Sequence, residues 1–154
     1  MISICILLIV LVVGVDFVCK WYVESHFKNG ETIYCARDKI VIRKVHNKGM
    51  MLNWMDEHPD TVKSVSFLAM IALLIYHVSL FRKTGLVKEK IGTALMAGGA
   101  ISNTFDRIRR GYVVDYIGFN CKCKKIAKIT YNLGDFALFA GAILVLIANI
   151  YKKQ

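Results

Sequence analysis

The sequence predicts an all-α integral membrane protein with four transmembrane helices and a small β-rich extramembrane cap between helices one and two. Of the 154 residues 56% are hydrophobic, only one is proline, and long apolar runs alternate with short basic stretches. A soluble domain of this size would have to expose the excess apolar side chains. The length suits one domain rather than two cores, so we expect a single membrane domain over residues 1–154.

Each apolar run is near the roughly 20 residues that cross a hydrocarbon core of about 30 Å. The first run has no basic region and no small-residue cleavage site, so we interpret it as a retained helix rather than a signal peptide. The third run is the shortest, but small residues recur in it at four-residue spacing, which lets helices approach closely. The expected helices cover residues 2–18, 65–81, 91–105 and 131–151.

The cap is expected over residues 21–63, between the first two helices. Residues 40–45 are rich in β-branched side chains, and residues 31–34 resemble a second short strand before them. Residues 56–60 then carry the acidic and proline residues that typically begin a helix. A small β-rich element outside the membrane follows from this pattern.

The net charge of +10 suits either nucleic acid or an anionic membrane surface. Because the basic residues lie between long apolar runs, we favour the membrane and expect no nucleic-acid partner. The segments 20–63 and 107–128 hold 15 of the 21 basic residues, which by raw count places them in the cytoplasm. The densest short loop is nevertheless 82–90, so composition alone does not decide the orientation.

The five cysteines are an odd number, which argues against a full disulfide framework. Cys121 and Cys123 form a C-x-C pair, but the second half of a zinc site is missing. We therefore expect unpaired thiols and no metal.

Aspartates at predicted helix ends are the candidate functional groups, since charged groups at membrane depth are costly and rarely idle. If the helices alternate in direction, the ends of the first and third helices and the start of the fourth share one face of the membrane. Four aspartates and five other polar residues then gather there. They are Asp16, Asp106, Asp115 and Asp135, with Lys20, Asn47, Asn103, Arg107 and Asn132.

Asp115 and Asp135 are the pair best suited to catalysis. Asp16 has Lys20 four residues away and Asp106 is followed by Arg107, which predicts structural salt bridges, the commoner role of a lone aspartate. Two close carboxylates share a proton, because both cannot ionise together. One can then activate water while the other polarises a peptide carbonyl, without metal or covalent intermediate.

Other chemistries find little support. The zinc-protease, phosphate-loop and nucleophile-elbow patterns are absent, and the S-x-x-K match at residues 25–28 lacks its companion motifs. The main rival is a small ion or proton carrier, which would place carboxylates along the depth of a helix. A non-catalytic assembly protein is the second rival, although both aspartates are retained.

Five ordered motifs resemble those of the bacterial lipoprotein signal peptidases (signal peptidase II). Residues 16–20 resemble the family's D-x-x-x-K, and residues 47–49 its N-x-G. Residues 98–107 resemble G-G-A-x-G-N-x-x-D-R, residues 111–117 resemble G-x-V-V-D-F-I, and residues 131–135 resemble F-N-x-A-D. The match runs along the whole chain.

The resemblance implies an aspartyl endopeptidase that cleaves prolipoproteins just before a diacylglyceryl-modified cysteine. It implies a multi-pass protein of the bacterial cytoplasmic membrane with cytoplasmic termini, a site near the outer face, lipid contacts and no cofactor; we expect a monomer. Asp115 and Asp135 match the catalytic pair. The residues matching those that support or line the site are Asp16, Lys20, Asn47, Gly49, Asn103, Asp106, Arg107 and Asn132.

The chain also departs from the family pattern. Phe17 replaces a glutamine, Ser102 a glycine and Gly134 an alanine. Met50 and Met51, followed by Leu52, replace a small-small-aromatic run after N-x-G. None of these changes removes the dyad, so we expect an active, divergent member whose substrate groove Met50 and Met51 can reshape.

Overall fold

The computed structural model describes residues 1–28, 30–49 and 55–151. The departures at Met50, Met51 and Leu52 lie outside the described residues. The elements, in chain order, are α1 (Ile2–His26), β1 (Thr32–Cys35), β2 (Ile40–Asn47), α2 (Pro59–Leu80), α3 (Val87–Arg110), β3 (Val113–Phe119), α4 (Lys124–Ala127), β4 (Thr130–Tyr131) and α5 (Leu133–Tyr151).

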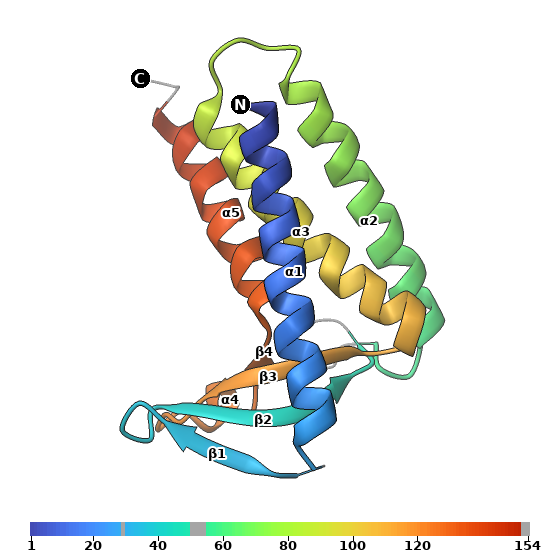
Figure 1. Cartoon of the computed structure of the whole chain (residues 1–154), viewed down its shortest axis with the longest axis vertical. Coiled ribbons are helices and arrows are strands. Elements are labelled where there is room, and N and C mark those ends of the chain that lie inside the picture. Colours follow the sequence, from blue (N-terminus) through green and yellow to red (C-terminus); the bar gives the residue numbers. More distant parts are fainter. Residues whose placement is uncertain (29, 50–54, 152–154) are drawn as a thin grey trace.

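The long helices form a bundle with α3 between the others (Figure 1). Among the described residues, α1, α2 and α5 are long and apolar enough to cross a membrane. The 24 residues of α3 span about 36 Å. Its mean hydropathy is lower than that of the other long helices because it contains more polar and small side chains. Many of these are buried against the neighbouring helices, whereas α1 and α5 expose apolar side chains. Its crossing of the membrane therefore stays a prediction.

Helices α3 and α5 approach closely through glycine. A Cβ atom added to Gly99 would collide with the Gly134 carbonyl, and one added to Gly141 with the Gly92 carbonyl. This is the arrangement by which small residues let membrane helices pack. The contact matters for the site because Gly134 is the residue before Asp135.

Three helices extend well beyond their predicted ends, and the second begins at Pro59 rather than at residue 65. The first continues to His26 rather than residue 18, and the third covers Val87–Arg110 rather than 91–105. Hydropathy detects only the apolar part of a helix, while the backbone hydrogen bonds continue through polar residues. Asp16 and Lys20 therefore lie within a helix, one turn apart.

The sheet is larger than expected and is not confined to the segment between the first two helices. It has four antiparallel strands in the order β1-β2-β3-β4, and β3 and β4 come from the segment between α3 and α5. The fold is thus not purely α-helical. In Figure 1 the sheet lies at one end of the bundle, opposite the N-terminus and the end of α5.

The turn into β3 depends on Gly111. This residue ends α3 with a φ of 81°, in the left-handed region, and its N–H donates to the Arg107 carbonyl at 3.2 Å. Glycine adopts this backbone at little cost. The strand that follows buries Val114 and Tyr116 against Val23 and Phe27 at the end of α1. This packing holds Asp115, between them in sequence, at the junction of sheet and bundle.

Candidate active site

Asp115 and Asp135 are joined through a single residue, Asn132. The Asn132 side-chain amide donates to Asp115 Oδ1 at 2.7 Å, while its backbone N–H donates to Asp135 Oδ2 at 3.1 Å. The backbone N–H of Asp135 in turn donates to Asn132 Oδ1 at 2.9 Å. Asp115 comes from β3 and Asp135 from the first turn of α5. One asparagine thus fixes the strand carboxylate and the helix carboxylate relative to each other.

Two further asparagines hold the outer oxygens of the pair. Asn47 Nδ2 donates to Asp115 Oδ2 at 3.0 Å, and Asn103 Nδ2 donates to Asp135 Oδ1 at 2.8 Å. Among the described residues, neither aspartate forms an ion pair within 4.0 Å. The pair therefore receives only neutral hydrogen bonds, which orient the carboxylates without neutralising them.

Burial and the charge of Asp135 together raise the pKa of Asp115 to about 7. The hydrogen bonds from Asn47 and Asn132, and then the charge of Lys20, oppose this rise in pKa. Only 3% of Asp115 is exposed, so its ionised form is poorly solvated. Near neutral pH the two carboxylates can therefore hold one proton between them.

Arg107 is a further cation close enough to interact with the pair, and among the described residues it forms no ion pair within 4.0 Å. Its Nη2 donates to the Gly49 carbonyl at 3.1 Å, and its charge interacts with those of Asp115 and Asp135. Within the described part of the chain, the buried Arg107 Nε and Asn47 Oδ1 have no hydrogen-bond partner. Both atoms are thus available to a bound molecule beside the aspartates.

Lys20 lies at the centre of a buried ionic cluster behind the pair. Its Nζ is 2.8 Å from Asp16 Oδ2 and 3.1 Å from Asp106 Oδ2, and it donates to Asn103 Oδ1 at 2.8 Å. The predicted pairing of Asp16 with Lys20 is present. The predicted pairing of Asp106 with Arg107 is wrong.

Asp106 binds Lys20 and also Arg110, whose Nε is 3.3 Å from Asp106 Oδ1. The sequence neighbour Arg107 points to a different side of the helix, since adjacent residues are about 100° apart. The four aspartates all gather at the sheet end of the bundle. This arrangement does not match carboxylates spread along the depth of a helix, as a carrier would require.

Two residues that the sequence assigned no role contact this cluster directly. Ser102 Oγ donates to Asp16 Oδ2 at 2.5 Å, and the Tyr116 hydroxyl donates to Asp16 Oδ1 at 3.1 Å. Ser102 was recognised only as a departure from the motif. The contact of Tyr116 could have been suspected from the sequence, because a tyrosine follows Asp115 where the motif has phenylalanine. Phe17, another departure, packs against Phe105 with ring centroids 4.9 Å apart.

A groove of about 430 Å³ runs between α2, α3 and α5 and reaches Asp135 of the pair. Its polar lining comes from Ser66, Asn103, Thr104, Arg107 and Asp135. The other lining residues are mainly apolar, among them Met70, Leu73, Met96 and Leu138. The groove therefore combines a polar, acidic part with apolar walls.

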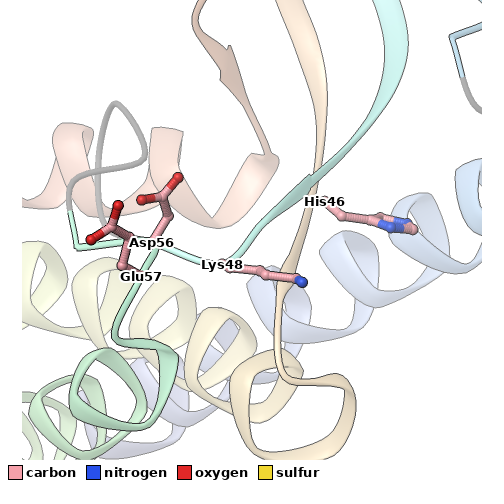
Figure 2. Close-up of a pocket in the computed structure, with 4 residues that line it drawn as sticks. All are labelled: His46, Lys48, Asp56 and Glu57. Carbon is pink, nitrogen blue, oxygen red and sulfur yellow. The ribbon is translucent and has the colours of Figure 1, made fainter.

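A second hollow, of about 360 Å³, lies beside the end of the sheet. Figure 2 shows Asp56 and Glu57 on the turn that leads into α2, with Lys48 and His46 on the side of β2. His46 points toward α1, where its Nε2 is 3.0 Å from Glu24 Oε2. Across the described residues, no group of three or more His, Cys, Asp or Glu side chains could hold a metal ion.

Known proteins resemble the chain over nearly its whole length. The family model described as signal peptidase (SPase) II matches residues 8–151. A lipoprotein signal peptidase of Halothermothrix orenii is 31% identical and covers 92% of this chain and 91% of its own. A lipoprotein signal peptidase of Fusobacterium nucleatum is 28% identical, and the match covers 100% of this chain and 89% of that protein. A solved structure described as a bacterial membrane enzyme is 26% identical, with a TM-score of 0.87. The match covers 100% of this chain and 92% of that chain.

Proposed function

Because the chain belongs to the signal peptidase II family, we propose that it removes the signal peptide from diacylglyceryl-modified prolipoproteins, with Asp115 and Asp135 as an aspartyl dyad. The family match confirms the membership that the motifs predicted, and it identifies the chain as a bacterial membrane protease. The observation that carries the rest of the proposal is the pair of buried carboxylates bridged by Asn132, with no basic partner among the described residues.

The dyad acts on the peptide bond by general acid–base catalysis. Near neutral pH it holds one proton, because burial and the charge of Asp135 raise the pKa of Asp115 to about 7. The ionised carboxylate takes a proton from water, whose oxygen attacks the carbonyl carbon. The protonated carboxyl donates to the carbonyl oxygen, forming a tetrahedral diol. Collapse of this intermediate passes a proton to the leaving nitrogen and breaks the C–N bond.

The surroundings of the dyad suit a peptide that carries apolar groups. The apolar walls made by Met70, Leu73, Met96 and Leu138 can contact a signal-peptide helix or the acyl chains of a modified cysteine. Arg107 Nε and Asn47 Oδ1 offer a donor and an acceptor to the backbone of a substrate. Cleavage just before the lipid-modified cysteine follows if the acyl chains enter the apolar part of the groove.

We further propose that α3 is the fourth membrane span and that the whole chain forms one membrane domain. The polar and charged side chains of α3 are largely buried among α1, α2 and α5, which removes much of their cost in lipid. With cytoplasmic termini, the sheet and the dyad lie at the outer face, in the bacterial cytoplasmic membrane. Contacts with lipids and a monomeric state belong to the same proposal.

The dyad is tested by Asp115→Asn and Asp135→Asn in full-length protein. We expect each variant to insert normally but to lose conversion of a lipid-modified precursor, since an amide cannot accept or hold the proton. Asp56→Asn, at an exposed carboxyl, is the matched control and should cleave like the unmodified protein. Cleavage at the unmodified rate by either dyad variant would refute the mechanism.

A further inference from the structure

Three departures from the signal peptidase II motifs surround one buried carboxylate, that of Asp16. Ser102 replaces a glycine, Tyr116 a phenylalanine and Gly134 an alanine. They come from α3, β3 and α5, while Asp16 belongs to α1. Nothing in their spacing along the chain connects them, so their convergence is a property of the fold.

The contacts of the three residues with Asp16 are complementary. Ser102 Oγ donates to Asp16 Oδ2 at 2.5 Å and the Tyr116 hydroxyl to Asp16 Oδ1 at 3.1 Å. A Cβ atom at Gly134 would lie 3.0 Å from the same Oδ2 and also 3.0 Å from Asn132 Oδ1. Asp16 and Ser102 are fully buried and Tyr116 is 5% exposed. The motif residues would supply neither hydroxyl, and the motif alanine would crowd the oxygen that Ser102 holds here.

We propose that Ser102 and Tyr116 are positioning residues that both hold Asp16 and set the geometry of the dyad, and that Gly134 is the residue this arrangement requires. We call Ser102, Tyr116 and Gly134 the Asp16 cage. The catalytic part of this inference rests on the proposed function, whereas the mutual dependence of the three residues rests on the geometry alone.

One route from the cage to the dyad runs through Lys20. Ser102 Oγ accepts a hydrogen bond from Lys20 Nζ at 3.1 Å. Lys20 also donates to Asn103 Oδ1 at 2.8 Å, and Asn103 Nδ2 donates to Asp135 Oδ1 at 2.8 Å. A change in the position of Lys20 therefore alters the hydrogen bond that orients Asp135.

The other route runs through Tyr116. Its hydroxyl accepts the backbone N–H of Leu133 at 3.2 Å, at the start of α5, where such groups lack a partner within the helix. Burial raises the pKa of Tyr116 above its ordinary value, so the phenol keeps the proton that it donates to Asp16. Tyr116 thus ties the strand of Asp115 to the helix of Asp135.

The proposal makes a specific prediction about combined substitutions. Gly134→Ala alone should lower kcat about tenfold or more, because its methyl group crowds Asn132 Oδ1 and also Asp16 Oδ2, which Ser102 holds in place. In the double variant Gly134→Ala/Ser102→Gly, Asp16 can move into the space that the serine leaves. We expect this second substitution to recover the part of the lost kcat and of the lowered unfolding midpoint that comes from the crowding of Asp16, so that the two effects are not additive.

Tyr116→Phe should lower kcat about tenfold while KM changes less than about twofold, because the substitution misplaces the dyad and leaves the groove intact. The measurements are steady-state cleavage of a lipid-modified precursor and chemical unfolding, both on full-length protein in detergent. The matched controls are Gly14→Ala, with nothing within 4 Å of the added methyl, and the exposed Ser64→Gly and Tyr34→Phe.

Independent effects of Gly134→Ala and Ser102→Gly on both kcat and the unfolding midpoint would overturn the cage. Coupled midpoints with unchanged kcat in Tyr116→Phe and in Gly134→Ala would overturn its positioning role. If the unmodified protein fails to cleave the precursor, the proposed function falls. In that case the unfolding midpoints of the single and double variants still test the Asp16 cage. Coupled effects of Gly134→Ala and Ser102→Gly on the midpoint support the cage, and additive effects refute it.

Discussion

Asp115→Asn should separate activity from stability in a way that depends on pH. In the folded protein burial and the charge of Asp135 raise the pKa of Asp115 from 3.8 to about 7. A raised folded-state pKa contributes stability that is fully present below the unfolded pKa and is lost as pH rises toward the folded one. The wild-type carboxyl therefore weakens the fold progressively between about pH 4 and pH 7.

The magnitude follows from the shift in pKa. At about 1.4 kcal/mol per pKa unit, the Asp115 carboxyl costs about 2 kcal/mol of folding free energy at pH 5 and about 4 kcal/mol at pH 8.5. Asparagine carries no such cost. It does lose one of the two acceptors that serve Asn47 and Asn132, which costs about 1 to 3 kcal/mol at every pH. The stability of Asp115→Asn relative to wild type should thus rise by roughly 2 to 3 kcal/mol between pH 5 and pH 8.5.

The assay is reversible chemical unfolding of both proteins in the same detergent at pH 5 and pH 8.5, beside the cleavage assay. Asp56→Asn, at an exposed carboxyl, is the matched control and should show no change of relative stability with pH. We expect Asp115→Asn to be inactive throughout and to gain relative stability at the higher pH. An Asp115→Asn difference in stability that is the same at both pH values would refute the raised pKa and the shared proton derived from it.

Two further predictions concern packing and orientation. Gly99→Ala should destabilise the protein by about 1 to 3 kcal/mol in unfolding measurements, because its methyl meets the Gly134 carbonyl, whereas Gly14→Ala should not. Equal midpoints for the two variants would contradict the close α3–α5 contact. The exposed thiols of Cys121 and Cys123 should react with an impermeant reagent in intact cells carrying Cys35→Ser. Labelling only after lysis would instead place the sheet in the cytoplasm.

Local patterns in the sequence predicted the helical part of the site well. The spacing of Asp16 and Lys20 within one turn predicted their ion pair, which the structure contains at 2.8 Å. Alternating helix direction predicted that the polar helix ends would gather at one end of the bundle. Both inferences need only helical geometry, because they join residues on one helix or at neighbouring helix ends.

Non-local pairing was not predictable from the same patterns. The sequence places Asp115 among the aspartates at helix ends, but it lies on β3, which joins β2 across the sheet and pairs Val45 with Asp115. The pairing shifts register between Ile42 and Val45, an irregularity that strand propensity alone does not indicate. For the same reason the cap was assigned to one loop, although two loops build the sheet. The Asp106–Arg107 pair failed because chain adjacency was taken for spatial proximity.

The position of the dyad explains why the site combines a sheet with a helix bundle. Asp135 lies in the first turn of α5, so helix packing alone can place it, and Gly134 lets α5 approach α3 at that point. Asp115 lies on β3, outside the long helices, and needs the sheet to carry it to the same place. Asn132, in the link between β4 and α5, contacts both. The two aspartates therefore lie where the bundle meets the cap, with Asp135 in the lining of the groove.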